Sequence, residues 1–239
     1  MMTTLETGPT AADFLSRHRG GGLFTETVNQ RVGAYLSVGA YRLGLAPTVL
    51  TLANLVLGLS GAVLVAGLAA RMHDGGVPAP VVGLGGLLLW QLAYSLDCAD
   101  GQLARVTGRT SPAGKRVDIL SDVALQIGLV CAVSAVGEKY SPEMPNWLVA
   151  AFAGTWMVNL ITSALQQGDA AGSLLASRSP AVRTVKLIRD YGAVLTGTAL
   201  VIAFAPHWTV WLMCAFVVVN GGFLLASIVA AARTSLSGT

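Results

Sequence analysis

Six long apolar runs divide most of the chain, and they are separated by short polar connections. A helix that crosses a bilayer needs roughly 20 mostly apolar residues. The runs predict helices over residues 48–70, 80–103, 116–137, 146–167, 191–206 and 208–231. The fifth run is the shortest, and the proline of Ala-Pro-His at 205–207 separates it from the sixth. We therefore expect an all-α integral membrane protein with a six-helix domain over residues 47–233.

A different pattern precedes the first run. Residues 23–46 carry apolar side chains near helical spacing with basic residues among them, namely Val28, Val32, Tyr35, Leu36 and Tyr41 with Arg31 and Arg42. This pattern favours an amphipathic helix in the headgroup plane of the membrane, although a solvated linker helix is the alternative. Residues 1–22 lack the apolar core of a secretory signal peptide. We expect them to form a flexible segment, and residues 234–239 a short tail.

Composition and charge support the membrane assignment. The chain is 54% hydrophobic and 11% charged, whereas soluble domains carry about 25% charged residues. Of its 15 lysines and arginines, only Arg71 and Lys139 fall on one side of the expected helices. The positive-inside rule therefore places both termini in the cytoplasm. The three cysteines fit neither a zinc pattern nor a disulfide framework. Membrane lipids are expected partners, and nucleic acid is not.

Four aspartates interrupt this apolar chain within a short stretch. Asp97 and Asp100 are three residues apart at the end of the second run, and Asp118 and Asp122 are four apart at the start of the third. Each pair shares a helix face, and a short connection lets the two pairs face each other. Four carboxylates so close would repel unless cations compensate them. Oxygen ligands without histidine or cysteine favour one or two Mg²⁺ or Mn²⁺ ions. Simple ion pairs with Arg105, Lys115 and Arg116 are the alternative.

The residues between the two pairs suit a phosphorylated ligand. Gly101 and Gly114 leave room for a ligand to approach the backbone, and Ala104 is small. Arg105 can give a bidentate hydrogen bond to phosphate. Mg²⁺ is commonly held by one or two carboxylates together with substrate phosphates. The stretch therefore predicts a metal-dependent diphosphate site at the cytoplasmic membrane surface.

Read as D-x2-D-G-x2-A-R-x8-G-x3-D-x3-D, residues 97–122 resemble the signature of the CDP-alcohol phosphatidyltransferase family, with every position filled. The resemblance implies that a CDP-linked donor, usually CDP-diacylglycerol, gives its phosphatidyl group to an alcohol and releases CMP. It implies that Asp97, Asp100 and Asp118 hold two divalent cations. Asp122 would be the general base and would also touch one metal. The nucleotide pocket would be lined by Gly101, Ala104, Arg105 and Gly114.

The resemblance extends to the start of the first run. Many family members carry Pro-Asn-x-x-Thr there, a sequence that helps to bind the nucleotide. Pro47 and Thr51 match it, whereas Thr48 replaces the asparagine. Asn54 stands where members that act on glycerol phosphate often have arginine, which argues against that subgroup. Thr51 is the candidate nucleotide-binding residue of this segment.

The acceptor is less defined. Basic residues on the same side of the membrane could bind a phosphorylated alcohol such as inositol phosphate, namely Lys115, Arg116, Arg183, Lys186 and Arg189. Topology and contact with anionic lipid headgroups explain the last three equally well. Three other functions stay open: a CDP-aminoalcohol phosphotransferase acting on diacylglycerol, a cation transporter, and an inactive scaffold. We expect a multi-pass protein of the plasma or inner membrane, with its site facing the cytoplasm, and the resemblance implies a homodimer.

Overall fold

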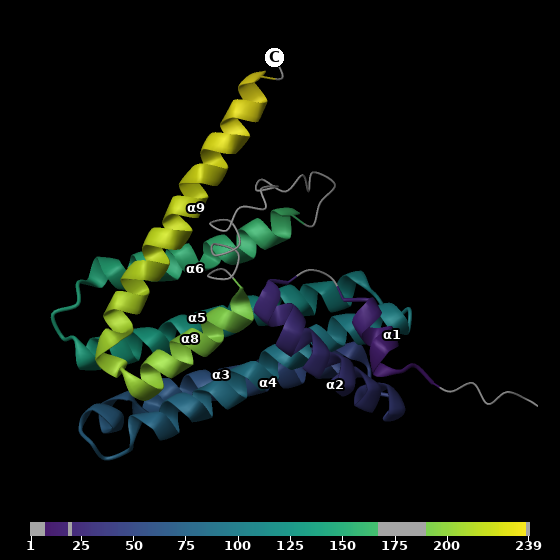
Figure 1. The fold of residues 1–239 in the computed structure, drawn as a ribbon, viewed down its shortest axis with the longest axis horizontal. Helices are drawn as coiled ribbons and strands as arrows, with labels where there is room; N and C mark the ends of the chain where they lie inside the picture. The colour runs from purple at the N-terminus through teal and green to yellow at the C-terminus, as the bar shows by residue number, and fades with distance from the viewer. Residues whose placement is uncertain (1–7, 19–20, 167–189, 238–239) are drawn as a thin grey trace, which may run out of the picture.

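The computed structural model describes residues 8–18, 21–166 and 190–237, and all regular structure in these ranges is helical (Figure 1). The elements are α1 Ala11–Ser16, the π-helical turn η1 Thr25–Asn29, α2 Gln30–Arg42, α3 Pro47–His73, α4 Ala79–Val106, α5 Pro112–Tyr140, α6 Asn146–Gln166, α8 Tyr191–Phe204, the 3₁₀ turn η2 Pro206–Trp208 and α9 Thr209–Ser237. The all-α prediction is confirmed for the described ranges.

Three long helices, α3, α4 and α5, form the centre of the fold. Each has a proline in its first turn, where the missing N–H would have had no helical partner. Short connections make them antiparallel neighbours, and α3 packs against both α4 and α5 while α8 packs against α4. The end of α4 and the start of α5 therefore lie beside the start of α3 (Figure 1). That end of the bundle carries the aspartates.

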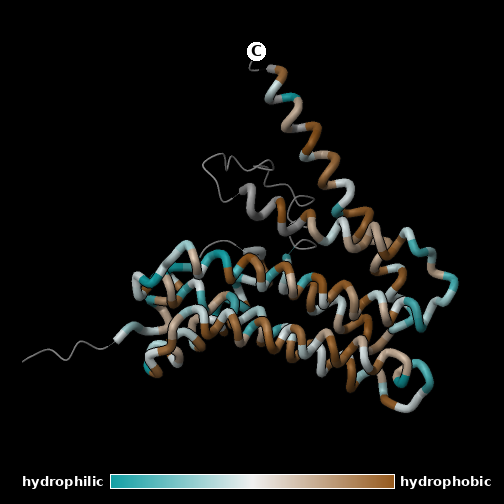
Figure 2. Tube along the Cα trace, turned by 180° about the vertical axis from the view of Figure 1, so that it is seen from behind, coloured by the Kyte–Doolittle hydropathy of each residue, from teal (hydrophilic) through white to brown (hydrophobic). Residues whose placement is uncertain are grey.

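Among the described residues, four helices are long and apolar enough to cross a membrane: Pro47–His73, Ala79–Val106, Pro112–Tyr140 and Pro206–Arg233. These correspond to the first, second, third and sixth expected spans. The apolar parts of the remaining two are shorter, at Asn146–Val158 and Tyr191–Phe204. The predicted break at 205–207 is confirmed, because α8 ends at Phe204 and η2 begins at Pro206. Figure 2 shows hydrophobic residues along most of each helix and hydrophilic ones mainly in the connections.

The last helix differs from the others in its packing. The beginning of α9 lies against α6, and its C-terminal part runs away from the bundle (Figure 1). It is the least buried of the four candidate spans. Its partners near the bundle are aromatic, with the rings of Trp156 and Phe216 stacked 4.4 Å apart.

Within the segment 23–46, predicted to be an amphipathic helix, residues 23–42 are helical and residues 43–46 form a turn before α3. The large and small side chains of this helix face opposite ways. The face of α2 that packs on α4 is made of small and polar residues, including Gly33 and Ser37, whose Oγ donates to the Ala99 carbonyl at 2.9 Å. A Cβ on Gly33 would lie 3.0 Å from the Ser95 carbonyl oxygen, so any other residue would push α2 away from α4. Large apolar residues point outward, and Tyr35 is 73% exposed.

The structure also contains a helix within the segment 1–22, which the sequence predicts to be flexible. Residues Ala11–Ser16 form α1, and Phe14 on this helix is fully buried. The sequence gives little sign of it because six residues cannot form a stable helix alone. Its apolar face is buried only through packing on α2 and α4.

Candidate active site

Three of the four predicted aspartates meet at one point. Carboxylate oxygens of Asp97 and Asp100 on α4 and of Asp118 on α5 all lie within 4.8 Å of one another. The local sequence explains this convergence. Asp97 and Asp100 share a face near the end of α4, and Ser111 caps the start of α5 by accepting from the Gly114 N–H at 3.0 Å. The cap fixes where α5 begins, and hence which of its residues face α4.

Asp122 lies one turn further along α5 and is not part of this close group. It follows Asp118 by four residues, so helical spacing places both on one face of α5. Asp122 is half-buried. The structure therefore sets it apart from the three clustered carboxylates while keeping it beside them. Its role as general base stays a prediction.

The first turns of α3 supply hydrogen-bond donors to the cluster. The Thr51 hydroxyl donates to Asp100 Oδ2 at 2.5 Å, and Asn54 Nδ2 lies 3.4 Å from Asp97 Oδ1. Both donors are almost fully buried. The antiparallel packing of α3 on α4 explains this pairing. The earlier residue on α3 meets the later aspartate on α4, and the later residue meets the earlier aspartate. Thr51, expected at the nucleotide, thus also orients a carboxylate of the cluster.

This donor set fits a divalent cation. Three carboxylates with oxygens within 4.8 Å of one another repel unless a cation lies among them. Carboxylate oxygens are the ligands that Mg²⁺ and Mn²⁺ prefer. Hydrogen bonds that orient metal-binding carboxylates, as those from Thr51 and Asn54 would, are typical of such sites. Arg105 and Lys115 supply the nearby positive charge that acts on Asp118.

The residues expected around the diphosphate lie along the same two helix ends. Arg105 folds back over Gly101, where an added Cβ would lie 2.9 Å from its Nη1 atom. Its Nε–H donates to the Arg17 carbonyl at 2.6 Å. Ala104 and Gly114 are half-buried. Glycine at 101 therefore leaves space for the guanidinium next to Asp100.

The candidate acceptor residues are only partly covered by the structure. Lys115 and Arg116 lie exposed in the first turn of α5, on the same end of the bundle as the aspartates. Arg183, Lys186 and Arg189 lie outside the described residues.

A second buried carboxylate was not predicted. Asp190 is 3% exposed and caps α8 by accepting from the Gly192 N–H at 3.1 Å. It also accepts from the Thr25 N–H at 3.0 Å and from the Thr25 hydroxyl. Thr25 Oγ1 lies 3.2 Å from the Tyr94 hydroxyl. Asp190 therefore joins η1 to α8, and Thr25 links it to Tyr94, which precedes Asp97 by three residues on α4.

An amide network continues this junction. Asn29 Nδ2 donates to Gln91 Oε1 at 2.8 Å and to Ser95 Oγ at 3.2 Å. Gln91 Nε2 in turn donates to the Gly192 carbonyl at 2.9 Å. These hydrogen bonds join η1, α4 and α8 next to the turn of α4 that carries Asp97. The signal in the sequence is Gln91, a polar side chain within an otherwise apolar run, although its partners cannot be read from spacing.

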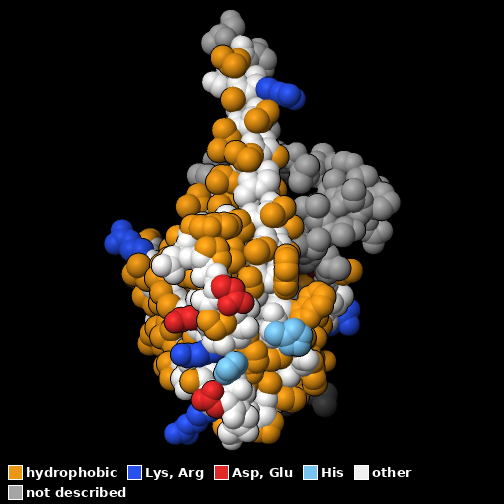
Figure 3. Space-filling view, turned by 90° about the vertical axis from the view of Figure 1, so that its left-hand side faces the viewer, with side chains coloured by type: hydrophobic (Ala, Val, Ile, Leu, Met, Phe, Trp, Pro, Cys, Tyr) orange, Lys and Arg blue, Asp and Glu red, His pale blue; other side chains and the backbone are white. Residues whose placement is uncertain are grey.

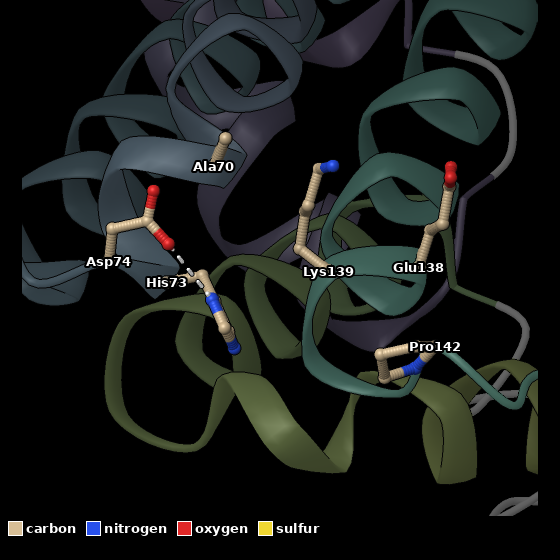
Figure 4. A pocket seen from close by; sticks show the side chains of 6 residues that line it. All are labelled: Ala70, His73, Asp74, Glu138, Lys139 and Pro142. Carbon is tan, nitrogen blue, oxygen red and sulfur yellow. Dashed lines mark hydrogen bonds and ion pairs between the residues drawn. The ribbon is translucent and has the colours of Figure 1, made fainter.

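The far end of the bundle has a pocket of a different kind. A pocket of about 380 Å³ is lined by Ala70, His73, Asp74, Glu138, Lys139 and Pro142 (Figure 4). His73 and Asp74 form an exposed ion pair at 3.2 Å. Figure 3 looks onto this end, where acidic, basic and histidine side chains lie scattered among hydrophobic ones. Asp118 and the pocket residue Lys139 lie about 20 residues apart on α5, which corresponds to roughly 30 Å along the helix.

Comparison with known proteins gives one family. The model of the CDP-alcohol phosphatidyltransferase family matches residues 44–219, which include α3, α4, α5 and the aspartate cluster. No curated protein matches the chain.

Proposed function

Because the chain belongs to the CDP-alcohol phosphatidyltransferase family, we propose that it transfers the phosphatidyl group of CDP-diacylglycerol to the hydroxyl of a small polar alcohol and releases CMP. The family makes the chain a membrane-bound transferase of substituted phosphate groups. The main support for this reaction is the convergence of Asp97, Asp100 and Asp118 within 4.8 Å of one another, with Arg105 nearby. This arrangement suits a diphosphate held through divalent cations.

The three clustered aspartates would hold two ions, Mg²⁺ or Mn²⁺. When bound, such ions neutralise the diphosphate and stabilise the departing oxygen. Thr51 and Asn54 keep the Asp100 and Asp97 carboxylates in place. Arg105, with Gly101, Ala104 and Gly114, contacts the cytidine diphosphate part of the donor.

Asp122 accepts the proton of the attacking hydroxyl. The acceptor oxygen then bonds to the phosphorus that carries diacylglycerol, the bond from this phosphorus to the bridging oxygen breaks, and CMP leaves with the electron pair. A carboxylate set apart from the close group suits this role because its oxygens can face the acceptor. Its distance from the group follows from the four-residue step between Asp118 and Asp122 on α5.

The proposed placement in the membrane has six spans, formed by the four long apolar helices together with α6 and α8. Both termini and the aspartates lie on the cytoplasmic side of the plasma or inner membrane, as the distribution of lysine and arginine supports. The outward apolar side chains of α2, Tyr35 among them, suit a helix that lies at the membrane surface. The active form is a homodimer.

The proposed acceptor is an alcohol that carries a phosphate, such as inositol phosphate. Lys115 and Arg116 lie exposed at the start of α5, beside the aspartates, and would contact that phosphate. Arg183, Lys186 and Arg189 are proposed to complete the acceptor pocket.

The proposal is tested by CMP release from CDP-diacylglycerol with a panel of alcohols and alcohol phosphates. We expect release to need Mg²⁺ or Mn²⁺ and to fall at least about 10³-fold in Asp122→Asn, which keeps the shape and removes the base. Turnover by this variant at the rate of the parent chain would refute the assigned base.

The same assay separates the competing functions. CMP release from CDP-choline and diacylglycerol, without release from CDP-diacylglycerol, would make the chain a CDP-aminoalcohol phosphotransferase. Metal-dependent ion flux in liposomes without CMP release from either donor would make it a transporter. Binding without any turnover would indicate a scaffold.

A further inference from the structure

Residues 8–18, which contain α1, form an N-terminal arm that lies against the helix end carrying the donor site. We propose that this arm is a positioning element of the transferase, which fixes the guanidinium of Arg105 for the diphosphate of the donor. The inference rests on the proposed function, since it assumes that Arg105 contacts the donor. The matched family region begins at residue 44, so the arm lies outside it.

The arm is held by its own cap and by one apolar anchor. Thr10 and Asp13 form a reciprocal capping box, in which the Thr10 N–H donates to Asp13 Oδ2 at 2.8 Å. Hydrogen bonds from Thr10 lower the pKa of Asp13 below its ordinary value. Phe14 is fully buried in a cluster with residues of α2, α3 and α4, and its ring lies 6.3 Å from that of Tyr41. Burial of this large apolar ring is the main interaction that docks the short helix.

The arm also makes a hydrogen bond to a residue of the proposed donor site. Just after α1, the Arg17 carbonyl accepts from Arg105 Nε at 2.6 Å. This contact joins residues 88 apart in the chain. A hydrogen bond at Nε restricts the rotation of the last side-chain bonds, so the plane of the guanidinium is fixed.

The fixed plane holds the terminal nitrogens over Gly101, the residue that follows Asp100. Nη1 and Nη2 lie over Gly101, at 2.9 and 3.1 Å from where its Cβ would be. Arg105 also acts electrostatically on Asp118. The guanidinium thus has the arm at its Nε edge and Gly101 beside its Nη atoms. An arginine already held in place loses less side-chain freedom when it binds phosphate.

The test compares the intact chain with two versions that lose the docked arm, namely Phe14→Ser and a deletion of residues 2–18. Each is made alone and together with Arg105→Lys. Lysine keeps the positive charge but has neither the Nε–H nor the planar guanidinium. The readouts are the Kd of CMP in the presence of Mg²⁺, by calorimetry, and the KM and kcat for CDP-diacylglycerol. Ala12→Ser, on the exposed side of α1, is the matched control.

We expect loss of the arm to raise the Kd of CMP and the KM of the donor roughly tenfold, the usual size for one charge-assisted hydrogen bond. The kcat and the affinity for Mn²⁺ should change less than about twofold. In the Arg105→Lys background, loss of the arm should have little further effect. Ala12→Ser should behave as the intact chain.

Four results would overturn the inference. Unchanged CMP affinity without the arm would show that Arg105 needs no support. If loss of the arm weakened CMP binding equally in the Arg105→Lys background, the arm would act on the fold and not through this arginine. An equal weakening of Mn²⁺ binding would lead to the same conclusion. An intact chain that neither binds CMP nor releases it from a CDP-linked donor would refute the proposed function, and the inference with it. In a chain that turns over, by contrast, arm-independent binding refutes the arm's role alone.

Discussion

Two acidic sites, the buried Asp190 and the partly buried cluster of Asp97, Asp100 and Asp118, stabilise their negative charge in different ways. At Asp190 a single carboxylate accepts hydrogen bonds from the Thr25 N–H, the Thr25 hydroxyl and the Gly192 N–H. At the cluster, three carboxylates within 4.8 Å share the donors Thr51 and Asn54. Three donors can satisfy one carboxylate, whereas three carboxylates this close repel one another. The first site is therefore satisfied by its own hydrogen bonds, and the second is one that a divalent cation would compensate.

The largest expected effect separates the two sites by function. Asp118→Asn removes one ligand of the proposed cation site, so CMP release should fall at least about 10³-fold. The same change removes one of three adjacent like charges. The unfolding temperature in the presence of a chelator should therefore stay the same or rise, as measured by a thermal scan in detergent. A lower unfolding temperature would mean that Asp118 is a structural ion-pair partner.

Asp190→Ala should show the reverse pattern, with stability as the main loss. The change leaves two buried donors of Thr25 and one of Gly192 without an acceptor, and each such group costs about 1–3 kcal/mol. We expect the unfolding temperature to fall by roughly 5–10 °C, while Mn²⁺ affinity is kept at temperatures where the variant is folded. Asp74→Ala is the matched control, because Asp74 is 75% exposed in its pair with His73. Equal effects of the two changes would refute the structural role of Asp190.

Thr51→Val tests the support that α3 gives to the cluster. It keeps the shape of the side chain and removes the hydroxyl that donates to Asp100. Loss of such an orienting hydrogen bond typically weakens metal affinity about 10–100-fold. Thr51→Ser should restore most of the affinity in a Mn²⁺ titration. Equal affinity in the valine and serine variants would assign Thr51 to the nucleotide alone.

Asn54→Leu should have the smallest effect. Its contact with Asp97 is long, at 3.4 Å, and its buried Oδ1 has no hydrogen-bond partner among the described residues. Mn²⁺ affinity should fall only about two- to threefold, while stability increases because an unsatisfied buried oxygen is removed. A loss of affinity as large as that of Thr51→Val would mean that Asn54 binds the metal or the substrate directly.

The aspartate cluster could be predicted because its geometry is local. Asp97 and Asp100, and likewise Asp118 and Asp122, are set by helical spacing, and the short connection between α4 and α5 brings the pairs together. Pro206 marks the end of α8 for an equally local reason. Asp190 and Phe14 could not be predicted in this way. The partner of Asp190 is 165 residues away, and Phe14 is buried only by surfaces of other helices.

The most direct test of the central claim is a Mn²⁺ titration of the purified chain, followed by electron paramagnetic resonance. We expect two ions per chain with the magnetic coupling of ions about 4 Å apart. Asp118→Asn should abolish this coupled signal, and Asp190→Asn should leave it intact. Binding that is equally tight in Asp118→Asn and the intact chain, or CMP release that persists in excess chelator, would contradict a cation site built from Asp97, Asp100 and Asp118.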